Sequence, residues 1–174
     1  KKVLKRNTPT EEIRKSINLV KNYQIPMELS AVFCFPGETV EQMWETIYLI
    51  DELNPSAVQS HMLFPYPHTE VFEICKDMGL IDEKIEMQIY QGEGSIVGES
   101  LLMHPDRDIA YVLVKMMAFY VKLPAFLKPL FKRLMNTKMK VFANAVFLIT
   151  IPVVFPWQGL TRLRELFRMV LFTR

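Results

Sequence analysis

The chain has 174 residues, half of them hydrophobic, and a formal net charge of only +2. A composition this apolar excludes disorder along the whole chain. The length is that of one domain, or of one small domain with an appendage. The basic first residues lead into a polar stretch and not into an apolar segment, so we expect no secretory signal and a cytoplasmic protein. Cys34 and Cys75 match no metal-ligand spacing, and we expect both to be reduced thiols.

The small net charge conceals two unlike halves. Residues 1–114 carry 10 Lys or Arg and 18 Asp or Glu, a net charge of −8. Residues 115–174 carry 11 Lys or Arg and a single acid, Glu165, a net charge of +10. This split argues against one uniform domain, and the basic block suggests an anionic partner.

The first elements alternate between helix and strand. Apolar residues at helical spacing predict a helix over 10–22, after a threonine and two acids suited to a helix start. Residues 27–33 alternate between apolar and polar side chains and then become wholly apolar, which is typical of a buried strand. A tight turn at 36–39 leads into a second amphipathic helix over 39–53.

The same pattern then repeats. Residues 57–64 predict a strand, residues 65–69 a loop stiffened by prolines, and residues 70–78 a third helix that ends at Gly79. Strands and helices that alternate through short loops imply parallel strands. The fold class predicted for residues 1–80 is therefore α/β, as part of a parallel (β/α) barrel.

The sequence after residue 80 divides into a connecting segment and a C-terminal region. Residues 81–104 are less regular, and their glycines lack the context of a dinucleotide-binding loop, so we expect an irregular connecting segment. Residues 105–174 are expected to form a basic, apolar, α-helical C-terminal region, with helices over about 106–121 and 160–172. The uncharged run 141–157 is a buried helix, an interfacial segment or, at the lower length limit, a membrane span.

Three motifs of the first 80 residues carry a family resemblance. They are Leu4-x-Arg6-Asn7-x-Pro9-Thr10-x-Glu12-Ile13, Pro36-Gly37-Glu38-Thr39 and Phe64-Pro65-Tyr66-Pro67-x-Thr69. This succession resembles the second half of the barrel of radical S-adenosylmethionine (radical SAM) enzymes. It is most similar to their cobalamin-dependent branch, which includes the anaerobic magnesium-protoporphyrin monomethyl ester cyclases and many methyltransferases.

The resemblance implies an enzyme that uses S-adenosylmethionine, a 4Fe–4S cluster and cobalamin. Such an enzyme cleaves S-adenosylmethionine to a 5′-deoxyadenosyl radical and then methylates or oxidatively cyclises a hydrophobic substrate, such as a porphyrin or a lipid. The cluster needs three closely spaced cysteines, which this chain lacks. We therefore expect a fragment that binds none of these cofactors alone and is inactive by itself.

Four residues are candidates for cofactor contact. In the family, S-adenosylmethionine lies across the ends of the strands, which implies that backbone atoms of Leu63, Phe64 and Pro65 flank its adenine. The resemblance also implies that Arg6 meets the carboxylate of S-adenosylmethionine through a charge-assisted pair. A solvated surface arginine is the alternative for Arg6. No catalytic residue and no metal ligand is assigned.

Five further residues have open roles. Cys34 and His68 stand where the family usually has glycine, so Cys34 either packs or narrows the barrel mouth, and the loop at His68 is expected to take a different turn. His68 either faces solvent or touches substrate or cobalamin. We expect Glu38 to cap the second helix, with ligand contact as the alternative, His61 to be a hydrogen-bonded core residue, and His104 to lie on the surface before a helix.

The expected partners follow from the same features. We expect a hydrophobic small-molecule substrate and no nucleic acid. We also expect the basic C-terminal region to touch the anionic face of the inner membrane, and exposed strand edges to pair with a second copy of the chain. A non-enzymatic helical module for membrane-surface or partner binding, which keeps part of a barrel as scaffold, is the alternative function. A third possibility, an unrelated α/β hydrolase or isomerase, is disfavoured because the sequence contains none of the motifs of such enzymes.

Overall fold

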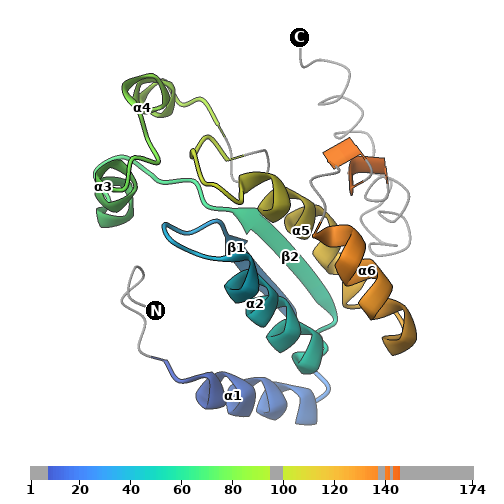
Figure 1. Cartoon of the computed structure of the whole chain (residues 1–174). Coiled ribbons are helices and arrows are strands. Elements are labelled where there is room, and N and C mark those ends of the chain that lie inside the picture. Colours follow the sequence, from blue (N-terminus) through green and yellow to red (C-terminus); the bar gives the residue numbers. More distant parts are fainter. Residues whose placement is uncertain (1–7, 95–99, 137–139, 142, 146–174) are drawn as a thin grey trace.

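A computed structural model of the chain describes residues 8–94, 100–136, 140, 141 and 143–145. Helices and strands alternate in its first half, and helices follow in its second half (Figure 1). The elements are α1 Thr10–Asn22, β1 Glu28–Phe33, α2 Val40–Leu53, β2 Ala57–Met62, α3 Glu70–Asp77, α4 Glu83–Tyr90, α5 Arg107–Tyr120, the short 3₁₀ helix η1 Ala125–Leu127, and α6 Lys128–Met135.

The two strands lie side by side and run parallel, in register from Glu28 with Ala57 to Phe33 with Met62. Because parallel neighbours need a crossover connection, the helix α2 between them is the expected arrangement. The predicted α/β class with parallel strands is confirmed. Within the described part of the chain the sheet has these two strands only, so the number of strands in a complete sheet stays open.

One face of the sheet carries the main hydrophobic core. Ala31 and Phe33 of β1 and Val58 and Met62 of β2 are buried in one cluster with the inner sides of α2 and α5. Successive side chains of a strand alternate between faces, so the residues between these point the other way. The helices α2 and α5 therefore cover one face of the sheet.

The other face is much less covered. On β1 it presents Glu28, Ser30 and Val32, all exposed, and on β2 Gln59 and His61, both half-buried. Parallel sheets of known proteins are normally buried on both faces and read as continuous apolar runs. This uncovered, mainly polar face will be called the open face.

A second, smaller core lies beyond the carboxyl ends of the strands, at the end of the molecule that α3 and α4 occupy (Figure 1). Phe72 and Cys75 of α3 pack there against Ile85 and Ile89 of α4 and against Leu102. The helix α4 corrects the expectation that residues 81–104 are irregular. Asp82 caps it through a 2.7 Å bond from the Ile85 N–H, and its two buried isoleucines, four residues apart, form its inner side.

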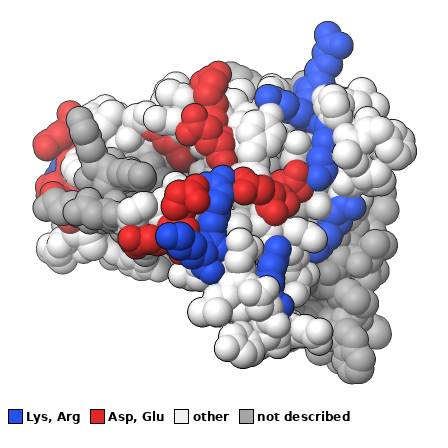
Figure 2. All heavy atoms as spheres, turned by 90° about the horizontal axis from the view of Figure 1, so that it is seen from below, with Lys and Arg blue, Asp and Glu red and all other residues white. Residues whose placement is uncertain are grey.

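The basic C-terminal half packs against the acidic N-terminal half. Lys128 Nζ lies 2.7 Å from both carboxylate oxygens of Asp51 on α2, and Lys140 Nζ lies 3.0 Å from Asp108 Oδ1. Lys132 Nζ lies 5.3 Å from the ring centroid of Trp44. Part of the charge that suggested an anionic partner is thus neutralised within the chain, and Figure 2 shows acidic and basic side chains intermingled on the face it displays.

Of the helices in the described residues, none is long and apolar enough to cross a membrane. Most of the uncharged run 141–157 and the whole of the helix expected over 160–172 lie outside the described residues. Both expectations therefore stay predictions.

Candidate functional site

The two parallel strands end at the same edge, where two loops begin. Residues 34–39 connect β1 to α2 and will be called the first rim loop, and residues 63–69 connect β2 to α3 and will be called the second rim loop. The Leu63 N–H donates to the Phe33 carbonyl at 2.8 Å, so the strand pairing continues into the second rim loop. Parallel α/β folds place their sites at this edge.

The first rim loop is a tight hydrogen-bonded turn. The Glu38 N–H donates to the Phe35 carbonyl at 2.9 Å, and the Phe35 N–H donates back to Glu38 Oε2 at 3.0 Å. Gly37 takes φ +72°, a conformation that favours glycine. Burial raises the pKa of the Glu38 carboxyl, while the backbone N–H groups of Phe35 and Cys34 oppose the rise.

The role expected for Glu38 is wrong, because Thr39 caps α2. The Thr39 side chain accepts from the Gln42 N–H at 3.4 Å, and the Gln42 side chain accepts from the Thr39 N–H at 3.0 Å. This reciprocal pair is the capping box of a helix start. Glu38 instead closes the turn before the helix, where its carboxyl group accepts the Phe35 N–H.

Cys34 follows β1 directly and is fully buried with φ +72°. Non-glycine residues rarely take this conformation, so the backbone at Cys34 is one that glycine would adopt more readily. Burial raises the pKa of its thiol to about 12, with Glu38 adding to the rise. The thiol is therefore protonated at neutral pH, and it packs in the main core.

Cys75 is equally buried, and burial raises the pKa of its thiol to about 11. Thiolates, not thiols, ligate metals and attack electrophiles. Within the described residues no three His, Cys, Asp or Glu side chains are grouped as a metal site would require.

The predicted contact residues Leu63, Phe64 and Pro65 begin the second rim loop. Leu63 and Phe64 are half-buried and pack against the second core, and Pro65 is buried. The Leu63 carbonyl accepts from Ser100 Oγ at 3.1 Å, so both of its backbone polar groups already have partners in the chain. Their contact with a cofactor stays a prediction, and Arg6 lies outside the described residues.

The backbone at His68 has a conformation that is typical of glycine. Its φ is +65°, and its side chain is exposed, with its ring centroid 6.0 Å from that of Tyr90. The backbone takes a left-handed conformation there, which glycine adopts more readily, and the different turn that we expected at this histidine stays a prediction. Both positions at which the resemblance expects glycine therefore have positive φ.

The other two histidines also differ from expectation. His61 on the open face is half-buried, and its Nδ1 is buried without a hydrogen-bond partner in the described part of the chain, so it is not the hydrogen-bonded core residue that we predicted. His104 is 6% exposed and not a surface residue. Its burial was missed because the sequence before α5 shows no periodicity, although Leu101 and Leu102 beside it indicate a buried segment.

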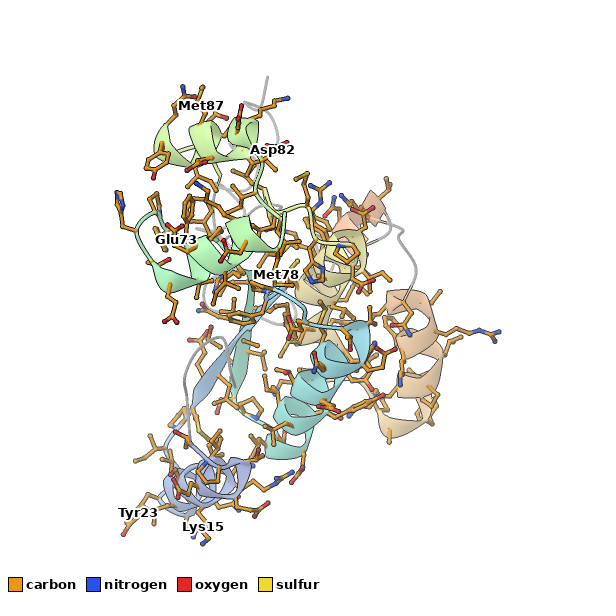
Figure 3. The ribbon with its side chains drawn as sticks, turned by 60° about the vertical axis from the view of Figure 1, so that its left-hand side comes forward. Lys15, Tyr23, Glu73, Met78, Asp82 and Met87 are labelled. Carbon is orange, nitrogen blue, oxygen red and sulfur yellow. The ribbon has the colours of Figure 1, made fainter. Side chains whose placement is uncertain are left out.

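The helices at the two ends of the strands are far apart. Met78, just after α3, lies toward the rim loops, whereas Lys15 on α1 and Tyr23 just after α1 lie at the opposite end of the molecule (Figure 3). Met78 Cε would be 3.6 Å from a Cβ added to Gly37, which places α3 against the first rim loop. The candidate site is thus bounded by the two rim loops and by α3.

Comparisons with protein-family models, with curated proteins and with solved structures found no match to this chain. The functional interpretation therefore rests on the residues and their geometry.

Proposed function

We propose that the chain is the C-terminal part of the (β/α) barrel of a radical SAM enzyme of the cobalamin-dependent branch. In this proposal the two rim loops form one wall of the cleft that binds S-adenosylmethionine. The complete protein methylates or oxidatively cyclises a hydrophobic substrate. The cysteine loop that holds the cluster and the cobalamin-binding region belong to residues outside this chain.

The observation that carries the proposal is the backbone of the rim loops. The two motifs of the resemblance follow neighbouring parallel strands and start at the same edge. Cys34 and His68 replace glycines of the family pattern and still adopt φ of +72° and +65°. A left-handed conformation costs a side-chain-bearing residue about 1–2 kcal/mol. Its presence at both positions is what an inherited glycine-type loop predicts.

The open face gives a second line of support. Two parallel strands with one polar, uncovered face do not make a stable sheet by themselves. Inside a closed barrel that face would line the interior, where polar side chains such as Gln59 and His61 meet a ligand. The unpaired edges of β1 and β2 within the described residues suit further strands on either side.

The two thiols of the chain do not fit the iron–sulfur cluster. The cluster needs three cysteines, and this chain has two. Both are buried, and burial raises the pKa of each thiol so that it stays protonated at neutral pH. We therefore assign this chain no cluster ligand and derive no step of the reaction through the cluster. Its own residues are proposed to shape the cleft and to hold S-adenosylmethionine by backbone contacts.

Anaerobic reconstitution of the complete gene product with iron and sulfide tests the proposal. We expect cluster absorbance and release of 5′-deoxyadenosine from S-adenosylmethionine. Replacing Cys34 and Cys75 by serine in that protein is the matched control and should leave the cluster absorbance intact. If the complete protein shows neither cluster absorbance nor cleavage of S-adenosylmethionine, the proposal is wrong.

A second candidate function, binding to an anionic membrane surface, is favoured by the outer side of η1 and α6. Phe126 is 79% exposed, Leu130 is 58% exposed, and the exposed Arg133 follows at helical spacing. Exposed apolar side chains beside a cation suit an anionic lipid interface. Against this, Lys128 and Lys132 are turned inward, toward Asp51 and Trp44.

Co-sedimentation with vesicles that contain anionic lipid tests this candidate. The double variant Phe126→Ser, Leu130→Ser should lose binding at physiological salt. Leu19→Ser on α1 is the matched control, because Leu19 is also 58% exposed. A wild-type chain that stays in the supernatant would exclude membrane binding by this surface.

A further inference from the structure

Three helical surfaces in the described part of the chain each carry two or more exposed, large apolar side chains. They are the outer sides of α1, of α4, and of η1 with α6, where the side chains are Ile13 and Leu19, Met87 and Tyr90, and Phe126 and Leu130, respectively. Exposed apolar side chains that lie together mark an interaction surface, whereas single ones do not. The charges around each surface decide which partner suits it.

The net charge differs in sign between these surfaces. Residues 66–94, which hold α3 and α4, carry seven acids and two lysines, a net charge of −5. Residues 10–25 around α1 have a net charge of +1, and residues 125–136 around η1 and α6 have a net charge of +3. Figure 3 shows two of the acids, Glu73 and Asp82, at the end of the molecule opposite α1. The surface of α4 is therefore the one of the three that suits a cationic partner.

The outer side of α4 follows from the spacing of its residues. Ile85 and Ile89 are buried and face the second core. Met87 and Tyr90, three residues apart on the outer side, are 62% and 54% exposed. Glu83 is also exposed and lies four residues before Met87, one helical turn away. Glu83, Met87 and Tyr90 thus form one line along the helix, which will be called the α4 stripe.

The α4 stripe is held in place by contacts with α3 and with the second rim loop. The Tyr90 ring centroid lies 6.1 Å from that of the buried Phe72 and 6.0 Å from that of the exposed His68. Lys76 Nζ on α3 lies 2.7 Å from Glu86 Oε1 on α4. A methionine beside a fixed aromatic ring gives an apolar contact that adapts to the shape of a partner. The stripe is therefore a preformed apolar surface among acidic side chains.

Residues 160–174, which lie outside the described part of the chain, have the complementary chemistry. They carry four arginines and one glutamate, a net charge of +3. Their apolar residues recur at helical spacing, as Leu160, Leu163, Phe167 and Leu171. An amphipathic helix binds a protein surface through apolar anchors at this spacing. Both the charge and the apolar pattern of this segment therefore match the α4 stripe.

We infer that residues 160–174 bind as a helix to the α4 stripe of the same molecule. Apolar side chains of the segment pack on Met87 and Tyr90, and its arginines meet the acids of α3 and α4. The chain between Ala145 and residue 160 spans up to about 50 Å when extended, and a domain of this size is about 40 Å across. The segment therefore reaches the stripe from any described position of residue 145. The inference goes beyond the proposed function and uses no cofactor contact.

A nitroxide attached to Thr173→Cys in the full chain tests the inference by nuclear magnetic resonance. We expect the nitroxide to broaden the amide signals of Met87 and Tyr90 beyond detection and to leave that of Leu19 unchanged. Reduction of the nitroxide should restore the lost signals. Cys34 and Cys75 are buried as protonated thiols and react slowly with the thiol reagent, so the wild-type chain treated in the same way is the labelling control.

Two pairs of substitutions at exposed positions separate specific binding from proximity. Glu83→Lys with Met87→Ser should restore the Tyr90 signal, because it removes one acid and one apolar anchor of the stripe. Glu12→Lys with Leu19→Ser makes the same chemical changes on α1 and is the matched control. This control should leave the Tyr90 signal broadened.

Three results would overturn the inference. The first is an unchanged Met87 and Tyr90 signal in the nitroxide-bearing chain. The second is broadening around Phe126 and Leu130 instead, which would place the segment on α6. The third is broadening of an isotope-labelled chain by a nitroxide on a different, unlabelled chain, which would assign the segment to a second copy. No cofactor enters these measurements, so failure to cleave S-adenosylmethionine would count against the proposed function alone.

Discussion

The two buried cysteines allow a matched test of the backbone of the first rim loop. Cys34 and Cys75 are both 0% exposed, but Cys34 has φ +72° and Cys75 lies within the helix α3. Replacing either residue by alanine or glycine removes the same thiol from a buried site. The order of stability of the two variants then depends on the backbone conformation at each position.

The expected difference has opposite signs at the two positions. At residue 34, alanine bears the left-handed penalty of about 1–2 kcal/mol, whereas glycine costs about 0.4–1 kcal/mol through the greater freedom of its unfolded chain. Glycine should therefore be more stable than alanine at residue 34 by about 1 kcal/mol. At residue 75, glycine should be less stable by about 1 kcal/mol, the difference in helix propensity.

Urea unfolding of the four variants, followed by circular dichroism, measures this difference. For a chain of this size 1 kcal/mol corresponds to about 2–4 °C in Tm, so thermal melts give an independent reading. If alanine is more stable than glycine at both positions, the left-handed conformation at Cys34 is wrong. The strongest argument for a glycine-type rim loop would then be lost.

Three smaller predictions concern the helix start, the contact between the two halves and the turn carboxylate. Thr39→Ala should lower the free energy of unfolding by about 1 kcal/mol because it removes the capping box, whereas Thr46→Ala should stay within about 0.5 kcal/mol; equal effects in urea would contradict the capping role. Asp51→Asn should cost about 1 kcal/mol by leaving Lys128 without its carboxylate, and this loss should shrink at high salt; a salt-independent loss would argue against an ion pair. Burial raises the pKa of Glu38 in the folded state above its ordinary value of 4.5. The ionised carboxylate therefore lowers the free energy of unfolding at pH 7. This loss disappears as the pH falls through the folded-state pKa toward the unfolded value, because the folded state then binds the proton. Glu38→Gln should therefore be more stable than wild type at pH 7 and equal to it near the unfolded pKa, and urea midpoints with the same difference at both pH values would refute this.

The sequence predicts the first half of the fold well because local signals agree there with the tertiary structure. The helix over 10–22 begins and ends where expected, and the bounds of β1, α2, β2 and α3 differ from the prediction by at most two residues. Apolar periodicity, prolines and turn residues all indicate the same boundaries in this part. The parallel pairing follows from the helix that connects the two strands, whereas the exposure of one face of β1 was not expected of a strand predicted to be buried.

Later features were missed because they depend on contacts between distant residues. The helix α4 has eight residues, and its signal is one cap and two isoleucines, which the glycines after it outweighed. His104 is buried in a segment without apolar periodicity, which is held by hydrogen bonds to Leu63 and Leu80, far away in the sequence. The lysines of the basic half were expected to meet an external anion, and no periodicity could indicate that Lys128 pairs with Asp51.

The candidate site was predicted as a location more accurately than as a set of contacts. The two rim loops do lie at the carboxyl ends of neighbouring parallel strands, as the motifs at 36–39 and 64–69 implied. The side chains around them act differently from the prediction, because Glu38 closes a turn and Ser100 occupies the Leu63 carbonyl. Such local hydrogen bonds depend on atomic positions that residue types alone do not determine.

The parallel strand pair at the base of the site is the claim on which the account depends, and one hydrogen bond tests it directly. The Leu63 N–H donates to the Phe33 carbonyl at 2.8 Å, one residue beyond β2. Nuclear magnetic resonance should detect a scalar coupling across this bond, from the Leu63 nitrogen to the Phe33 carbonyl carbon, with contacts between Val32 and His61 in parallel register. Coupling of Leu63 to a different carbonyl, or contacts in antiparallel order, would contradict the shared rim and the site built on it.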